Sequence, residues 1–204
     1  MLKFGFCAAV AASAITASSS AAILVFTNDF VWSSYAAAGD MTIETETFES
    51  YNGFYPSPLT GVLAGVNWAA NAGGGIYVGA AGGSQALSTN NPEAMTISFD
   101  TGVVQGVAGN LFATDINFNV VPSIVQISLA DGTSYIAFVD SATAFAGFYS
   151  TGAAINSITI SAQPLPGGTN NVYPTFDNMK LAAIPAPGAI ALLGLAGLAG
   201  RRRR

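Results

Sequence analysis

Short stretches in which apolar and polar residues alternate are the feature of this 204-residue chain that most restricts its fold. The alternation runs through residues 95–100, 115–120, 124–129 and 157–161. Successive side chains of a strand point to opposite faces, so this pattern is typical of strands with one buried and one solvated face. The body of the chain contains no convincing apolar helical stripe longer than two turns.

An Asp-Gly pair separates two of these apolar segments. Asp131 and Gly132 tolerate the φ angles of a tight turn, which predicts a hairpin between residues 124–129 and 133–139. Many short strands joined by turns rich in Gly, Asn and Asp are typical of all-β domains. We therefore expect an antiparallel two-sheet β-sandwich with jelly-roll topology.

Charge is distributed unevenly along the chain. Residues 23–183 contain all eleven acidic residues and a single basic residue, Lys180, so their formal balance is 1 − 11 = −10. This excludes a nucleic-acid partner, because phosphate contacts need clustered Lys and Arg. An acidic body favours solubility and divalent cations.

The chain has no histidine, and its single cysteine is Cys7. Histidine-based triads and zinc sites are therefore excluded, and a hydrolase would need paired carboxylates. Glu44 and Glu46 are predicted to lie about 6.6 Å apart on one strand face. There they would repel each other instead of flanking a substrate. We expect a non-catalytic protein, and the alternative is a secreted carbohydrate-active enzyme that uses paired carboxylates.

The first 22 residues have the pattern of a secretory signal peptide. Lys3 provides a positive charge, residues 4–16 are apolar, and Ser20 to Ala22 are small residues of the kind that signal peptidase reads. We expect cleavage after Ala22, which leaves residues 23–183 as one domain.

Residues 184–204 have the pattern of a membrane-targeting segment. A Pro-x-Pro motif precedes an apolar run at 188–200, and four arginines follow. A helix of that run would be about 20 Å long, while a bilayer core needs about 30 Å, so we expect transient membrane association. The motif and its cationic stop consist of Pro185, Ala186, Pro187, Arg201, Arg202, Arg203 and Arg204.

The Pro-x-Pro motif, the apolar run and the terminal arginines, in this order, resemble the PEP-CTERM sorting signal. Ala186 stands where the family usually has Glu. The resemblance implies that an exosortase, a membrane-embedded cysteine protease, cuts at the motif. It also implies export across the inner membrane of a Gram-negative-type bacterium and a transient membrane anchor. The final location would be the cell surface or the extracellular space.

A second resemblance covers about residues 44–182. Its motifs are Thr47-Phe48-Glu49, the segment 107–115, Leu129 to Thr133, the segment 145–150 and the segment 173–178. The series resembles β-sandwich domains of PEP-CTERM proteins, which are distantly similar to carbohydrate-binding modules and lectin-like jelly rolls. Fold analogy by itself does not determine function.

Glu49 and Asp177 are candidate calcium ligands. In calcium-bearing jelly rolls of the carbohydrate-binding type, an acidic residue near the first strand and one on the last strand share an ion. The resemblance therefore implies a structural Ca²⁺ here, with backbone carbonyls completing its six to eight oxygens. The alternative is that Glu49 is a surface residue and Asp177 belongs to a turn.

An aromatic loop is a candidate for sugar contact. Tyr51, Phe54 and Tyr55 lie close together in sequence, with Trp68 further on. Exposed aromatic faces stack on sugar rings. The alternative is that these rings cover the core beneath a long loop.

A polar comb is the second candidate for sugar contact. Asp115, Asn117 and Asn119 are spaced i, i+2 and i+4, which predicts a flat hydrogen-bonding strip on one sheet face. An ordinary solvated strand face has the same pattern. We expect an exported surface or extracellular-matrix protein that contacts exopolysaccharide.

Overall fold

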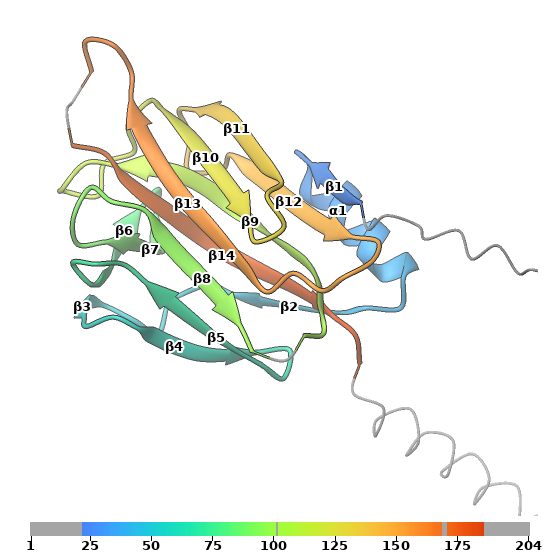
Figure 1. The fold of residues 1–204 in the computed structure, drawn as a ribbon. Coiled ribbons are helices and arrows are strands. Elements are labelled where there is room, and N and C mark those ends of the chain that lie inside the picture. The colour runs from blue at the N-terminus through green and yellow to red at the C-terminus, as the bar shows by residue number, and fades with distance from the viewer. Residues whose placement is uncertain (1–21, 101, 169–170, 186–204) are drawn as a thin grey trace, which may run out of the picture.

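The computed structural model describes residues 22–100, 102–168 and 171–185, which form fourteen strands and one helix (Figure 1). The predicted signal peptide lies outside the described residues except for Ala22. The predicted sorting signal also lies outside them, except for Ile184 and Pro185.

The strands form two antiparallel sheets. The larger sheet has the order β1-β12-β9-β14-β7-β6-β3, with β2 also paired to β14. Its strands are β1 (Ile23–Phe26), β2 (Thr42–Glu46), β3 (Gly53–Tyr55), β6 (Ile76–Ala81), β7 (Ser84–Thr89), β9 (Val104–Thr114), β12 (Phe145–Ser150) and β14 (Tyr173–Ala183). The smaller sheet has the order β11-β10-β13-β8-β5-β4. Its strands are β4 (Leu59–Leu63), β5 (Val66–Asn71), β8 (Met95–Phe99), β10 (Ser123–Leu129), β11 (Ser134–Val139) and β13 (Ser157–Pro164).

The two sheets face each other across one hydrophobic core (Figure 1). Full burial of a large apolar side chain contributes about 1.5–3 kcal/mol, so this core is the main source of stability. Its fully buried large side chains come from both sheets and include Trp68, Met95, Ile97, Ile127 and Ile158 of the smaller sheet and Ile76, Leu87, Phe148 and Phe176 of the larger one. The predicted all-β class and the two antiparallel sheets are confirmed.

The predicted hairpin is also confirmed. Strands β10 and β11 pair in antiparallel register, and Gly132 between them has φ +91°. The Asp131 carboxylate accepts a hydrogen bond from the Thr133 backbone N–H at 2.9 Å. Gly132 thus stabilises the turn for the predicted reason, its tolerance of a positive φ, while Asp131 stabilises it through its side-chain hydrogen bond.

The predicted strand at 115–120 is wrong. Residues 115–119 form a turn after β9, and Phe118 has φ +62°. The Asp115 carboxylate accepts hydrogen bonds from the backbone N–H groups of Asn117 and Asn119, at 2.8 and 2.9 Å. Such side-chain bonds satisfy the local backbone in place of a ladder, so the alternating pattern does not form a strand.

Helix α1 (Asp29–Ala38) was not predicted. Asn28 precedes its first residue, and the Asn28 side chain caps the helix by accepting from the Val31 N–H at 3.1 Å. Trp32 is fully buried, but Phe30 is 80 % exposed. The helix therefore lacks the apolar stripe with a polar opposite face that reveals a surface helix. Among the described residues, no helix is long and apolar enough to cross a membrane.

Trp32 holds α1 on the outer face of the larger sheet. Its ring covers Gly106 and Gly147, where an added Cβ would lie 2.9 and 2.6 Å from ring atoms. Its indole N–H donates to the Phe148 carbonyl at 3.1 Å. Glycines in two adjacent strands thus form the seat on which the helix rests.

Replacing Trp32 by alanine is expected to release α1 from the sheet and to lower the free energy of unfolding by about 3–5 kcal/mol. Denaturant unfolding of the full chain measures this change. Phe30→Ala is the matched control, because it removes an exposed aromatic ring from the same helix and is expected to change stability by less than about 0.5 kcal/mol. Equal losses in the two variants would contradict the proposed role of Trp32.

Candidate functional site

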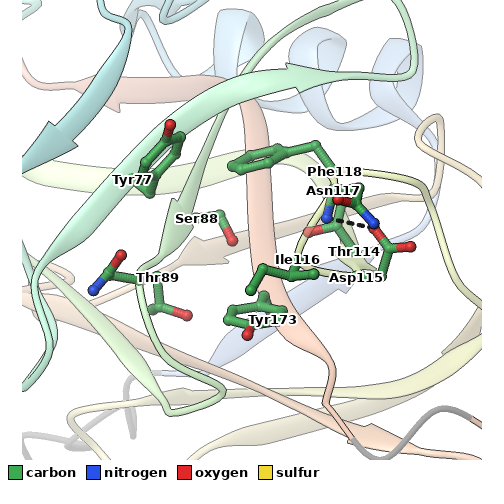
Figure 2. Close-up of a pocket in the computed structure, with 10 residues that line it drawn as sticks. Tyr77, Ser88, Thr89, Thr114, Asp115, Ile116, Asn117, Phe118 and Tyr173 are labelled. Atoms are coloured by element: carbon green, nitrogen blue, oxygen red, sulfur yellow. Dashed lines mark hydrogen bonds between the residues drawn. The ribbon is translucent and has the colours of Figure 1, made fainter.

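A cleft of about 400 Å³ lies on the outer face of the larger sheet, at the opposite end of β9 and β14 from α1. We call it the outer-face cleft. Figure 2 shows it between strands β6, β7 and β14 and the turn that follows β9. Its lining residues are Tyr77, Ser88, Thr89, Asn90, Thr114, Asp115, Ile116, Asn117, Phe118 and Tyr173.

The turn beside the cleft is organised by Asp115. Besides its two backbone partners, the carboxylate accepts a third hydrogen bond from the Asn119 side-chain amide at 3.0 Å. This side-chain bond is the main reason that the Asp115 pKa lies below its usual value, with the backbone N–H groups adding to it. Asp115 therefore carries a fixed negative charge at neutral pH.

Phe118 is placed over the sheet by a glycine. An added Cβ at Gly79 of β6 would lie 2.8 Å from the Phe118 ring, so only glycine leaves room for this contact. The same ring packs beside Tyr77, with ring centroids 5.6 Å apart and planes inclined by 43°. Figure 2 shows both rings along one side of the cleft.

Phe54 lies next to this pair on the same sheet face, and its ring lies over Gly75, where an added Cβ would be 2.5 Å away. Phe54 of β3 lies directly opposite Tyr77 of β6, a position that places the Cβ atoms about 5 Å apart on one sheet face. Phe54 is 55 % exposed and Tyr77 is 37 % exposed. We call Phe54, Tyr77 and Phe118 the aromatic strip, and it leads along the sheet surface to the outer-face cleft.

The cleft contains both buried and exposed polar groups. The Ser88 hydroxyl donates to the Pro174 carbonyl at 3.1 Å and accepts from Thr175 at 3.1 Å, so it is satisfied within the fold. The Asn117 side chain is exposed, and its amide makes no hydrogen bond to another described residue. Asn117 is therefore the cleft side chain best able to donate and accept for a ligand.

The structure separates the three residues of the predicted polar comb. Asp115 and Asn117 line the cleft, but the Asn119 amide is bound to Asp115 and is not among the lining residues. The comb is consequently a turn with one exposed amide, and not a flat strip on a strand.

The predicted aromatic loop is divided in a similar way. Tyr51 and Tyr55 are half-buried and pack edge to face, with ring centroids 6.0 Å apart. Tyr51 also packs on Trp68, which is fully buried, and burial raises the Tyr51 pKa. Of these four aromatic residues, Phe54 alone lies in the aromatic strip.

Glu49 and Asp177 approach each other beside the start of β7. Glu49 accepts from the Gln85 backbone N–H at 3.1 Å, and Asp177 accepts from the Ser84 hydroxyl at 2.5 Å. Asp177 is only 4 % exposed. Burial is the main reason that its pKa is raised, and the charge of Glu49 adds to the effect.

The donor set near this pair is small. Asp177 also accepts two hydrogen bonds from Asn178, one from its backbone N–H and one from its side-chain amide. The described residues contain no group of three or more His, Cys, Asp or Glu side chains arranged for a metal ion. A calcium ion would therefore depend on the remaining carboxylate lone pairs together with neighbouring backbone carbonyls.

Glu44 and Glu46 each hold a backbone turn. Glu44 accepts from the Ala64 N–H at 2.7 Å, and Glu46 accepts from the Phe48 N–H at 2.9 Å. Ala64 and Phe48 both have positive φ, at +52° and +59°. These two carboxylates are used to stabilise local conformations that non-glycine residues rarely adopt.

Sequence reasoning missed Tyr77 and Tyr173. They are about a hundred residues apart, and only strand pairing brings both to one face. The Gly79 in β6 was a usable signal, because a glycine inside a strand often marks a close approach by another group.

No family model matches the chain, and no curated protein matches it. Among solved structures, a rhamnosidase from Klebsiella oxytoca with rhamnose bound matches 78 % of this chain with 7 % sequence identity and a TM-score of 0.33. The match covers 33 % of the rhamnosidase, so the chain spans about a third of that enzyme. A likeness at this level carries no argument about fold or function.

Proposed function

We propose that this protein is an exported, non-catalytic surface or extracellular-matrix protein that contacts exopolysaccharide through the aromatic strip and the outer-face cleft. The observation that carries the proposal is the aromatic strip, of which Tyr77 and Phe118 line the same cleft as the exposed Asn117 amide. Aromatic faces pack on the apolar faces of sugar rings, and an amide both donates to and accepts from sugar hydroxyls.

The carboxylates support a binding role over catalysis. A glycosidase needs two carboxyl groups on either side of the scissile bond. Asp115 is the one carboxylate among the residues that line the outer-face cleft, and its oxygens already accept three N–H groups. Glu44 and Glu46 are bound to backbone turns. The alternative of a carbohydrate-active enzyme therefore lacks a specific observation in its favour.

Tyr77→Ala removes the central ring of the aromatic strip and is expected to weaken glycan binding about tenfold, an effect of about 1.4 kcal/mol. The measurement is a glycan array with the full chain in a sugar-free detergent, followed by affinity measurement on the best polymer. A reducing-end assay on the same polymer is expected to detect no hydrolysis.

Phe138→Ala is the matched control for Tyr77→Ala, because Phe138 is an exposed aromatic residue on the edge strand β11 of the other sheet. It is expected to leave the affinity unchanged. Equal weakening by both variants would argue against the aromatic strip as the binding surface, and hydrolysis of the polymer would favour the enzyme alternative.

We further propose that the sandwich has jelly-roll, lectin-like topology. The support comes from the chain path between β8 and β14, in which strands repeatedly cross between the two sheets. Strands β8, β10, β11 and β13 lie in the smaller sheet, while β9, β12 and β14 lie in the larger one. Crossing between two sheets is how jelly rolls are connected.

Sorting by an exosortase is the third part of the proposal, and it is supported by the sequence of residues 184–204. We expect the exported protein to lack Ala189 to Arg204, because a run this short holds the chain in a bilayer only transiently. Intact-mass analysis of protein from the producing cell measures this loss of the C-terminal residues.

Replacing the four arginines by serine is expected to leave the precursor uncut or in the wrong compartment, since the cationic stop sets the orientation. An exported protein that retains its arginine tail would contradict the proposal.

A structural calcium ion shared by Glu49 and Asp177 is the last part of the proposal, supported by the position of the two carboxylates, which accept from the adjacent residues Gln85 and Ser84. Calcium at about a hundredfold excess over its Kd adds about 2.7 kcal/mol to the free energy of unfolding. The melting temperature in calcium should therefore be about 5–10 °C higher than the melting temperature in a chelator.

Asp177→Asn should abolish that rise in melting temperature. Asp140→Asn, which changes an exposed acid elsewhere, should retain it. Identical wild-type melts with calcium and with chelator would contradict the site.

A further inference from the structure

The outer-face cleft has no basic side chain among its lining residues. Lys180 is the one basic residue in the described part of the chain, and its ammonium group is paired with Asp29 of α1, with one N···O distance of 2.6 Å. Lys180 is seven residues from Tyr173 along β14, which corresponds to roughly 20 Å at the usual strand rise. No positive charge from these residues is therefore close enough to pair with a ligand in the cleft.

A negative charge is fixed at the cleft instead. The Asp115 carboxylate is held by three N–H groups, at 2.8 to 3.0 Å, and cannot rotate away without breaking them. The rest of the described chain contributes ten more acidic residues. Their summed field makes the surface negative, and it repels anionic ligands over about a Debye length, which is about 10 Å in 0.1 M salt.

The remaining contact groups in and beside the cleft are uncharged. They include the rings of the aromatic strip, the ring of Tyr173, and the side-chain amides of Asn117 and Asn90, the latter of which also donates to the Gly74 carbonyl at 3.2 Å. Aromatic faces and amides recognise ring faces and hydroxyl groups without needing an ionic partner. A buried acidic group on a ligand would remain unpaired here, and unpaired charges are costly to desolvate.

We propose that the outer-face cleft selects neutral glycans and excludes those that carry carboxylate, sulfate or phosphate groups. The inference rests on the proposed glycan contact and specifies its ligand class. Selection results from the absence of a basic side chain among the described residues that line the cleft, and from the negative charge that Asp115 fixes there.

Matched polymers test this selection. Dextran, mannan and a soluble β-glucan, each with its carboxymethylated derivative, are measured against the full chain in a sugar-free detergent. For any polymer that binds, the carboxymethylated form is expected to bind at least about tenfold more weakly at low salt. The ratio of the affinity for the neutral polymer to the affinity for its carboxymethylated form should fall toward one as the salt concentration is raised, because screening shortens the range of the repulsion.

A charge variant separates the local effect from net charge. Asn90→Lys introduces a cation at the cleft and is expected to narrow the ratio to below about threefold. Ser134→Lys adds the same charge on β11 of the other sheet and is expected to keep the ratio near its wild-type value.

The outcomes distinguish the two proposals. Equal or tighter binding of the carboxymethylated polymers would overturn the selection of neutral glycans while leaving glycan contact intact. Equal narrowing by both lysine variants would also overturn it, because the effect would then belong to net charge and not to the cleft. Absence of binding by every polymer would overturn the proposed function, and the ligand class with it.

Discussion

The pairing of β9 with β14 is the contact on which the rest of the structure depends. Both strands have eleven residues, and their register runs from Tyr173 opposite Thr114 to Ala183 opposite Val104. They lie at the centre of the larger sheet, so every other strand of that sheet is attached directly or indirectly to this pair. Of its two register irregularities, the one between Asp177 and Lys180 divides the pair into two main segments, and the other lies at the end of the pair, between Ala182 and Ala183.

These two segments give the outer face of the larger sheet two different surfaces. At one end, glycines and alanines leave a shallow seat for the Trp32 ring and therefore for helix α1. At the other end, Thr114 and Tyr173 line the outer-face cleft, which the turn after β9 closes on one side. In both places an aromatic ring rests on glycine: Trp32 on Gly106 and Gly147, and Phe118 on Gly79. Close packing of a ring on backbone is possible there because no Cβ intervenes.

Individual elements show why parts of this arrangement were predictable. The alternation at 95–99 and 157–161 identified β8 and β13 because one face of the smaller sheet is solvated. Helix α1 covers part of the outer face of β9, and most residues of this strand are buried, so they do not alternate. The alternation of apolar and polar residues at 115–120 predicted a strand wrongly, because the Asp115 side chain satisfies the backbone N–H groups within the turn. Phe54, Asp115 and Asn117 were recognised as candidates, but Phe54 was assigned to a different surface from Asp115 and Asn117.

The sequence alone determined the all-β class, the hairpin at Asp131-Gly132 and the excess of acidic residues, because each depends on residues close in the chain or on composition. Only the tertiary structure decided which side chains share a surface. Phe54, Tyr77 and Phe118 come from two strands and a turn, and their neighbourhood is set by the register of β3 with β6 and by the space above Gly79. The physical reason is that strand register and close packing depend on the whole sheet, and no local stretch of sequence contains that information.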